Sequence, residues 1–272
     1  MDQQTRPYAG GSVPENYERH LVPLLFLGYA ADLAGRMDLE PGTNVLETAC
    51  GTGALTRQLQ TRLAPDSRLT VTDVAPPMME QVRRVVGDQP NIEYRQADAI
   101  EMPFPDDVFD AVACQFSVML FLDKSKGMQE AARVLKPGGG FVFNVWDRLD
   151  LNGFSRAVHE AVAQVFPDDP PGFLQIPYAY HDLSRIVGEL QDAGFDEIDI
   201  TVQPRESRAD DAPQVAMGLV AGSPLANQVA ERGSPSLEEA TETVARTLID
   251  DFGPGPIKAP MQAFQMVAHL AA

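Results

Sequence analysis

The sequence has few basic residues. Lysine and arginine number 21 against 39 aspartates and glutamates over 272 residues, which gives a formal net charge of −18. A nucleic-acid-binding protein needs a basic stripe, because binding releases counterions from the phosphate backbone. The sequence contains no run of lysine or arginine that could form one. We therefore expect no nucleic-acid partner and attribute the acidity to solubility.

Cysteines and long apolar runs are also scarce. Cys50 and Cys114 are the only cysteines, and each lies beside an apolar strand-like run rather than in a secreted disulfide framework. No segment reaches the roughly 18 apolar residues of a membrane span. Residues 1–5 show no basic stretch followed by an apolar one, so we expect no leader there. We expect a cytoplasmic protein without a membrane partner. No histidine–cysteine–acid cluster has metal-ligand spacing, so we also expect no metal site.

The rest of the composition is typical of a soluble globular protein, with 44% hydrophobic and 22% charged residues. Short β-type runs alternate with amphipathic helical runs, which predicts βαβ units and a doubly wound, mostly parallel sheet. We expect a single α/β domain over residues 1–272, with its core at 41–146. The expected strands lie at 44–47, 69–72, 92–95, 109–114 and 141–145, with helices at 54–63, 77–86 and 124–135 and a glycine turn at 136–140.

The segments around this core predict a rim. Residues 1–40 read as an N-terminal helical cover, and the long stretches 147–180 and 210–255 read as lid or substrate-rim insertions. A helix at 182–193, a strand at 197–202, a helix around 237–251 and a final edge strand at 261–270 complete a seven-stranded sheet. The aromatic residues of the first insertion suit a partly apolar ligand; they are Phe154, Phe166, Phe173, Tyr178 and Tyr180.

A glycine loop follows the first expected strand. The strand runs into Thr48-Ala49-Cys50-Gly51-Thr52-Gly53 and then into a helix, and the two glycines let the backbone approach a ligand closely. Dinucleotide sites and plain βα turns use the same arrangement. Because Glu47 precedes the loop and no lysine lies within it, a cationic ligand fits better than a pyrophosphate.

Two further acids follow the next strands. Asp73 lies about 20 residues past the glycines, where an acid in this fold meets the ribose hydroxyls of an adenosine. Capping the following helix is its alternative role. Asp98 could accept a hydrogen bond from an adenine amino group while the Ala99 amide donates to the ring, or it could be a turn residue. With Glu47 at a neighbouring strand end, we favour the binding roles.

The motifs, taken in order, resemble the class I S-adenosylmethionine-dependent methyltransferases, in the group that includes the ubiquinone/menaquinone C-methyltransferases. They cover about half of the chain. One departure is Ala49, which stands where many relatives carry the first glycine. The motifs are VLETACGTG at 45–53, VTDV at 71–74 with Met78, ADAIEMPFP at 97–105, FDAVACQF at 109–116 and RVLKPGG at 133–139.

This resemblance implies S-adenosylmethionine as the methyl donor, S-adenosylhomocysteine as its product and a small molecule as the acceptor. It also implies an N-terminal helix over the donor, with Tyr17 at the methionine end or at the acceptor; anchoring that helix is the alternative role of Tyr17. The implied contacts are Glu47, Ala49, Gly51 and Gly53 with the methionine part, Asp73, Val74 and Met78 with the ribose and adenine, Asp98 and Ala99 with the adenine edge, and Gln115 and Phe116 as the floor near the sulfonium.

No catalytic residue can be assigned from the sequence. An acceptor hydroxyl or carbon acid would need a base, and His20, His159, His181 and Tyr17 are the candidates. For each of these histidines a surface or packing role is favoured over that of a base, and for His269 even more so. Two other functions remain open, a nicotinamide-dependent oxidoreductase and a non-catalytic binding protein, because fold does not fix function. The sequence does not determine whether an O, N or C atom is methylated, nor the oligomeric state.

Overall fold

The computed structural model describes residues 13–271, and the chain divides into two compact units. One, the helical unit, comprises residues up to Leu27 together with Asp147–Ala179 and Pro204–Gln262. The other, the sheet unit, comprises Gly28–Trp146, Tyr180–Gln203 and the residues from Ala263 onward. The expected single domain with lid insertions stays a prediction. The expectation that residues 1–5 carry no leader lies outside the described residues.

Within residues 13–271, seven strands form one sheet in the order β3-β2-β1-β4-β5-β7-β6. Neighbours from β3 to β5 are parallel, and β7 is antiparallel to β5. This confirms the predicted doubly wound, mostly parallel sheet. The strands are β1 (Asn44–Glu47), β2 (Arg68–Asp73), β3 (Ile92–Gln96), β4 (Phe109–Gln115), β5 (Leu135–Trp146), β6 (Phe195–Ala209) and β7 (Ile257–Leu270).

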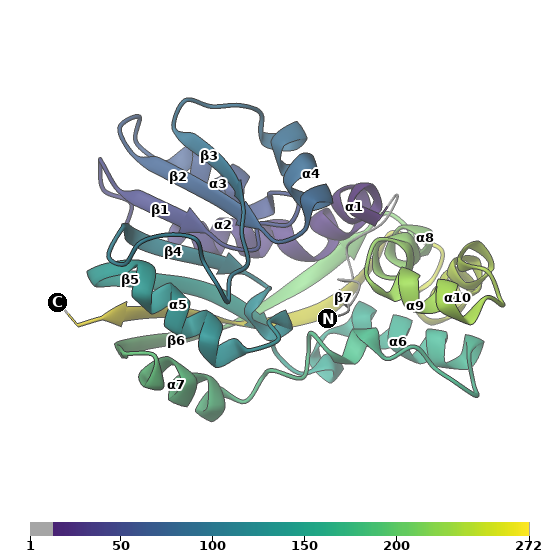
Figure 1. The fold of residues 1–272 in the computed structure, drawn as a ribbon. Coiled ribbons are helices and arrows are strands. Elements are labelled where there is room, and N and C mark those ends of the chain that lie inside the picture. Colours follow the sequence, from purple (N-terminus) through teal and green to yellow (C-terminus); the bar gives the residue numbers. More distant parts are fainter. Residues whose placement is uncertain (1–12, 272) are drawn as a thin grey trace. The chain divides into compact units, whose positions relative to one another are not determined.

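Helices cover both faces of this sheet. Figure 1 shows α5 and α7 on one face and α2 and α3 on the other, as the connections between parallel strands require. Aspartates begin two of them: Asp123 Oδ1 accepts the Lys126 amide at 2.9 Å, and Asp182 caps α7. The helices of the sheet unit are α2 (Leu27–Gly35), α3 (Ala54–Arg62), α4 (Pro76–Val86), the short η2 (Val118–Leu120), α5 (Lys124–Val134) and α7 (Leu183–Asp192).

The helical unit packs α10 against α6 and α8. The rings of Phe154 and Phe252 meet edge to face at 5.2 Å, and the Tyr178 hydroxyl donates to Ser155 Oγ at 2.6 Å. None of the described helices is both long and apolar enough to cross a membrane. The helices are α1 (Val13–Asn16), the π-helix η1 (Tyr17–Phe26), η3 (Leu149–Leu151), α6 (Gly153–Val165), η4 (Phe173–Gln175), α8 (Ala212–Ala216), the π-helix η5 (Met217–Ala221), α9 (Leu225–Arg232) and α10 (Leu237–Phe252).

The helix and strand ranges expected over residues 44–135 agree with the structure to within one residue at each end. One expectation beyond them is wrong: the last strand is not an edge, because β7 lies between β5 and β6 in the sheet and pairs with β5. The glycine turn expected at 136–140 lies within the bounds of β5. There the partner of Phe109 is Leu135 but the partner of Ala111 is Gly140, and Gly138 has left-handed backbone (φ 74°).

The two insertions contain more helix than expected. Their prolines are compatible with helices: Pro213 lies in the first turn of α8 and Pro224 directly precedes α9, where a missing amide costs nothing. The expected fit of the first insertion's aromatic residues to a partly apolar ligand stays a prediction. All five are buried and pack inside the protein: Phe154, Phe166, Phe173, Tyr178 and Tyr180.

Candidate cofactor site

The glycine loop is tied to the strands on both sides of β1. The Thr48 amide donates to Ala113 O on β4, and the Cys50 amide donates to Thr72 O on β2, each at 2.9 Å. Ala49 (φ 50°) and Gly51 (φ 56°) both have left-handed backbone. For Ala49 this conformation costs about 1–2 kcal/mol, which the two flanking hydrogen bonds offset. The loop therefore keeps the glycine-type turn despite the alanine.

Close helix packing explains the second glycine of the loop. Gly53 begins α3 with a φ of 93°, and a β-carbon there would lie 2.7 Å from Val82 Cγ2 on α4. That distance is shorter than a van der Waals contact, so a side chain would push α3 away from α4. Glycine thus sets the position of the amino end of α3.

Asp73 joins the glycine loop to the end of β2. Its Oδ2 accepts the Gly51 amide at 2.9 Å and its Oδ1 accepts the Ala75 amide at 2.8 Å. Ala75 precedes α4, so the predicted capping role is partly present alongside the tie to the loop. A carboxylate can accept about four hydrogen bonds, so these two are compatible with ribose hydroxyl donors as well.

Glu47, at the end of β1, is a buried carboxyl group whose hydrogen-bonding capacity is not satisfied. Its exposure is 1%, and neither carboxyl oxygen makes a hydrogen bond of good geometry within residues 13–271, although the hydroxyl and amide of Thr56 lie near enough to favour its ionised form. Burial is the main cause that raises its pKa to about 8, and the charge of Asp73 raises it further while nearby Thr56 lowers it. An uncompensated buried acid is costly, so the position suits a ligand with a positive charge or a donor.

The loop after β3 lies against the end of β2. The Ala97 amide donates to Asp73 O at 3.1 Å, and Asp98 Oδ1 accepts the Ile100 amide at 3.2 Å. The turn role of Asp98 is therefore present in the structure. Its predicted contact with adenine, and that of the adjacent buried Ala99, stay predictions.

The remaining predicted contacts also belong to the sheet unit. Val74 O accepts Gln96 Nε2 at 3.0 Å, and Met78 is buried in the first turn of α4. Gln115 is the last residue of β4 and Phe116 directly follows it, and Ser117 Oγ lies 3.5 Å from Ala49 O. Except for Tyr17, the predicted residues are thus gathered at the carboxyl ends of β1 to β4 and on the adjoining loops and helix starts.

Tyr17 belongs to the helical unit, where its ring stacks on Phe26 at 5.4 Å. The predicted anchoring of its helix is consistent with that contact, and its donor contact stays a prediction. The four histidines do not lie at the carboxyl ends of β1 to β4: His20 and His159 belong to the helical unit, His181 precedes α7, and His269 is on β7. No catalytic base is assigned.

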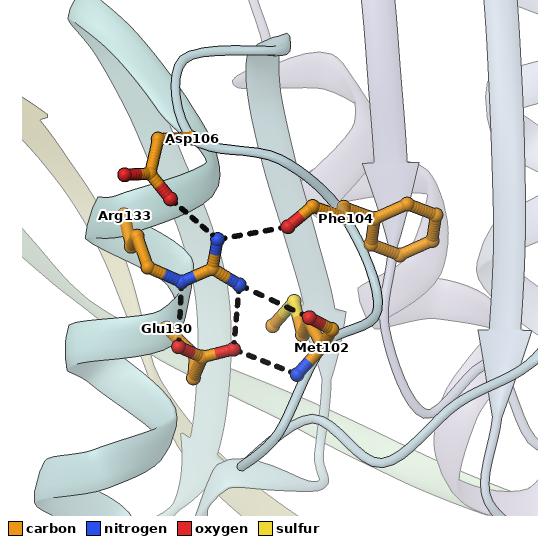
Figure 2. A network of polar contacts seen from close by, with 5 residues as sticks. All are labelled: Met102, Phe104, Asp106, Glu130 and Arg133. Atoms are coloured by element: carbon orange, nitrogen blue, oxygen red, sulfur yellow. Dashed lines mark hydrogen bonds and ion pairs between the residues drawn. The ribbon is translucent and has the colours of Figure 1, made fainter.

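An arginine to which the sequence assigned no role, although it begins the RVLKPGG motif, holds the loop after β3 in place. Figure 2 shows Arg133, on α5, with its guanidinium between Glu130 and the loop. It donates to both Glu130 carboxyl oxygens, to Asp106 Oδ1 and to the carbonyls of Met102 and Phe104, at 2.7 to 3.0 Å. These bonds use all five donors of the guanidinium. Glu130 Oε2 also accepts the Met102 amide at 2.7 Å.

Replacing Arg133 with methionine is expected to lower the free energy of unfolding by about 2–3 kcal/mol, because Glu130 and two loop carbonyls lose charged donors. Arg84→Met is the matched control: its pair with Glu80 is 57% and 75% exposed, and its loss should change stability by less than about 0.5 kcal/mol. Urea denaturation of both variants measures the difference. Equal stabilities would show that the five bonds contribute nothing.

Comparisons with known proteins agree with this geometry. Residues 46–143 match the methyltransferase domain family. The ubiquinone/menaquinone biosynthesis C-methyltransferase of Klebsiella pneumoniae is 30% identical over 171 residues, which cover 58% of this chain and 68% of that protein. The corresponding protein of Cronobacter sakazakii is 34% identical over 158 residues, so the chain spans about half of that relative, 56% of its length.

A solved structure shows the same fold. Phosphoethanolamine N-methyltransferase 2 of Haemonchus contortus, in complex with phosphomonomethylethanolamine and S-adenosylhomocysteine, superposes with a TM-score of 0.60 at 17% identity. The match covers 95% of this chain and 57% of that one. The segment matched to the domain family contains Glu47, the glycine loop, Asp73 and the loop after β3.

Proposed function

The chain belongs to the class I S-adenosylmethionine-dependent methyltransferases and resembles their ubiquinone/menaquinone C-methyltransferase members, and from this premise we propose that Glu47, the glycine loop and Asp73 bind the methyl donor. The protein transfers a methyl group from S-adenosylmethionine to a small-molecule acceptor. The observation that carries the proposed site is Glu47, a buried acid without a hydrogen-bond donor beside a loop of left-handed backbone.

Each part of the proposed site matches one part of the donor. The methionine end is held by Glu47, Ala49, Gly51 and Gly53. There the ligand's ammonium group would provide a positively charged hydrogen-bond donor for the Glu47 carboxyl group. Asp73, Val74 and Met78 hold the ribose and adenine. Asp98 and Ala99 border the adenine, and Gln115 and Phe116 form the floor near the sulfonium.

When bound, S-adenosylmethionine supplies an already activated methyl group on a positively charged sulfur. The task of these residues is therefore to orient the donor and keep water away from it, rather than to perform chemistry of their own. The loop suits this task, because its amides are held by β2, β4 and Asp73. A rigid loop spends little conformational entropy on binding.

The finer points of the proposal concern the acceptor and the place of action. We propose that the protein acts in the cytoplasm without a nucleic-acid or membrane partner. The net charge of −18 and the two free thiols, Cys50 and Cys114, support this. Whether an O, N or C atom of the acceptor is methylated is for experiment.

Labelled methyl transfer tests the proposed function. The purified protein is incubated with S-adenosylmethionine carrying an isotopically labelled methyl group and with small-molecule cell extract, and labelled products are found by mass spectrometry. We expect label in a small molecule with the unaltered protein and much less with Asp73→Asn. Binding of S-adenosylhomocysteine without any transfer would indicate a non-catalytic binding protein. Thermal stabilisation by NAD and not by S-adenosylhomocysteine would indicate an oxidoreductase.

A further inference from the structure

Phe116 has a backbone conformation that aromatic residues rarely adopt. Among residues 13–271 only three non-glycine residues have a positive φ. Two of them follow neighbouring strands: Ala49 lies two residues after the end of β1, and Phe116 (φ 51°) directly follows β4. Such conformations cost about 1–3 kcal/mol, cluster at functional sites and persist only where the surroundings hold them. The position of Phe116 therefore needs a cause.

The side chain of Asn144 supplies that cause. Asn144 is on β5 as the register partner of Gln115, and its Oδ1 accepts the Phe116 amide at 2.8 Å. Only the oxygen of the amide can accept a hydrogen bond, so this contact fixes which way the group points. Asn144 is completely buried, and its Nδ2 has no acceptor among the described residues. A polar residue kept at this cost in an apolar strand indicates a positional role.

The side chain of Phe116, whose amide Asn144 binds, is part of an aromatic cluster. The Phe116 ring stacks on Trp146 at 3.8 Å with an interplanar angle of 11°. Tyr29 meets Phe116 edge-on at 5.2 Å and Trp146 edge-on at 5.4 Å, and its hydroxyl donates to Gln203 O at 2.9 Å. All three rings are buried. The direction of the Phe116 ring is thus set by its backbone conformation together with Trp146 and Tyr29.

We propose that Asn144 is a positioning residue of the donor site, which holds Phe116 in the left-handed conformation and so aims its ring at the floor beside the glycine loop. The inference rests on the proposed function. Without Oδ1 the Phe116 amide would be buried and unpaired, and the left-handed conformation would lose its support. The turn after β4, which reaches Ala49 through Ser117, would move with it.

The single tryptophan of the chain makes this testable without knowledge of the acceptor, because Trp146 is the residue on which Phe116 stacks. Fluorescence of Trp146 and calorimetric titration with S-adenosylhomocysteine are measured on the unaltered protein and on Asn144→Ala. We expect Asn144→Ala to bind S-adenosylhomocysteine about tenfold more weakly, as it would if only about a tenth of the molecules kept Phe116 in the binding-competent conformation. We also expect its Trp146 emission to differ from that of the unaltered protein before any ligand is added.

Gln265→Ala is the matched control. Gln265 is the register partner of Asn144 on β7, equally buried and also with an unpaired amide nitrogen, but its Oε1 accepts Arg36 Nε at 2.6 Å instead of the Phe116 amide. Its loss should lower stability while leaving affinity within about twofold and Trp146 emission unchanged. Asn144→Asp, which keeps an acceptor oxygen, should restore the emission.

Should Asn144→Ala not fold, Asn144→Val takes its place, because a β-branched residue favours the strand and provides no acceptor. Affinity and emission equal to those of the unaltered protein in either variant would overturn the inference. Equal losses of S-adenosylhomocysteine affinity and equal changes of Trp146 emission in Gln265→Ala and Asn144→Ala would also overturn it. Failure of the unaltered protein to bind S-adenosylhomocysteine would overturn the proposed function instead.

Discussion

Asp73→Asn is expected to weaken the binding of S-adenosylhomocysteine by about 10- to 150-fold, or about 1.4–3 kcal/mol. The Asp73 carboxylate accepts the Gly51 and Ala75 amides, one on each oxygen. An asparagine has a single acceptor oxygen, so its NH2 group would face one of these two N–H donors. The glycine loop would lose one of its two ties to β2, with the Cys50–Thr72 hydrogen bond left in place, and the proposed ribose hydrogen bonds would lose their charge. Isothermal titration calorimetry at one pH measures the affinity.

Asp182→Asn is a suitable control for that substitution. Asp182 also accepts two backbone amides, from Ser184 and Arg185, but at the start of α7 and away from the glycine loop. Asparagine caps a helix about as well as aspartate, so both stability and affinity should stay close to those of the unaltered protein. Unchanged affinity in Asp73→Asn, with an intact circular dichroism spectrum, would remove the ribose assignment.

The affinity for S-adenosylmethionine is expected to rise with pH because of Glu47. Burial raises the pKa of Glu47 to about 8, so this carboxyl group is mostly protonated in the free protein at neutral pH. A cationic ligand favours the ionised form, and its binding must then release a proton. Affinity should increase by up to about tenfold per pH unit between about pH 6 and pH 7.5, below the range in which the ligand's own ammonium group titrates. Glu47→Gln should bind more weakly and lose this pH dependence.

The same group makes the stability of the free protein depend on pH with the opposite sign. The pKa is raised in the folded state above its usual value of 4.5, so the folded protein binds more protons than the unfolded chain between these values. The free energy of unfolding should therefore fall as the pH rises from about 4.5 to about 8, by a few kcal/mol. In Glu47→Gln that fall should be smaller. Urea denaturation across this pH range is the measurement, and identical profiles would contradict the burial of an unpaired Glu47.

The part of the site that sequence reasoning predicted well is local in the chain. The strand, the glycine loop and the helix that follow one another over residues 44–62 reflect short-range rules: a short buried apolar run, positive φ at the loop glycines, and a glycine at the start of the helix, where a side chain would not fit. Asp73 could be predicted for the same reason, since parallel strands place successive loops at one edge of the sheet. The pattern of residues alone carries these features.

The residues that sequence reasoning missed depend on contacts between distant parts of the chain. Asn144 was missed because it reaches the predicted residue Phe116 only through the pairing of β4 with β5, whose register shifts just before Gly140. Arg133 reaches the loop after β3 from a helix about 30 residues further on. Two signals were nevertheless present: an asparagine within the apolar run of β5, and the helical spacing of Glu130 and Arg133.

By itself the sequence determined the parallel core, the glycine loop and the acids at the ends of the first three strands, because each follows from the local spacing of apolar residues, glycines and carboxylates. Only the tertiary structure decided which acid is left without a partner. Glu47 and Asp73 are both carboxylates at strand ends, but loop amides hydrogen-bond to Asp73 while Glu47 is enclosed without a donor. Desolvation and hydrogen bonding depend on what surrounds a group in space, and that is set by strand pairing rather than by the neighbours along the chain.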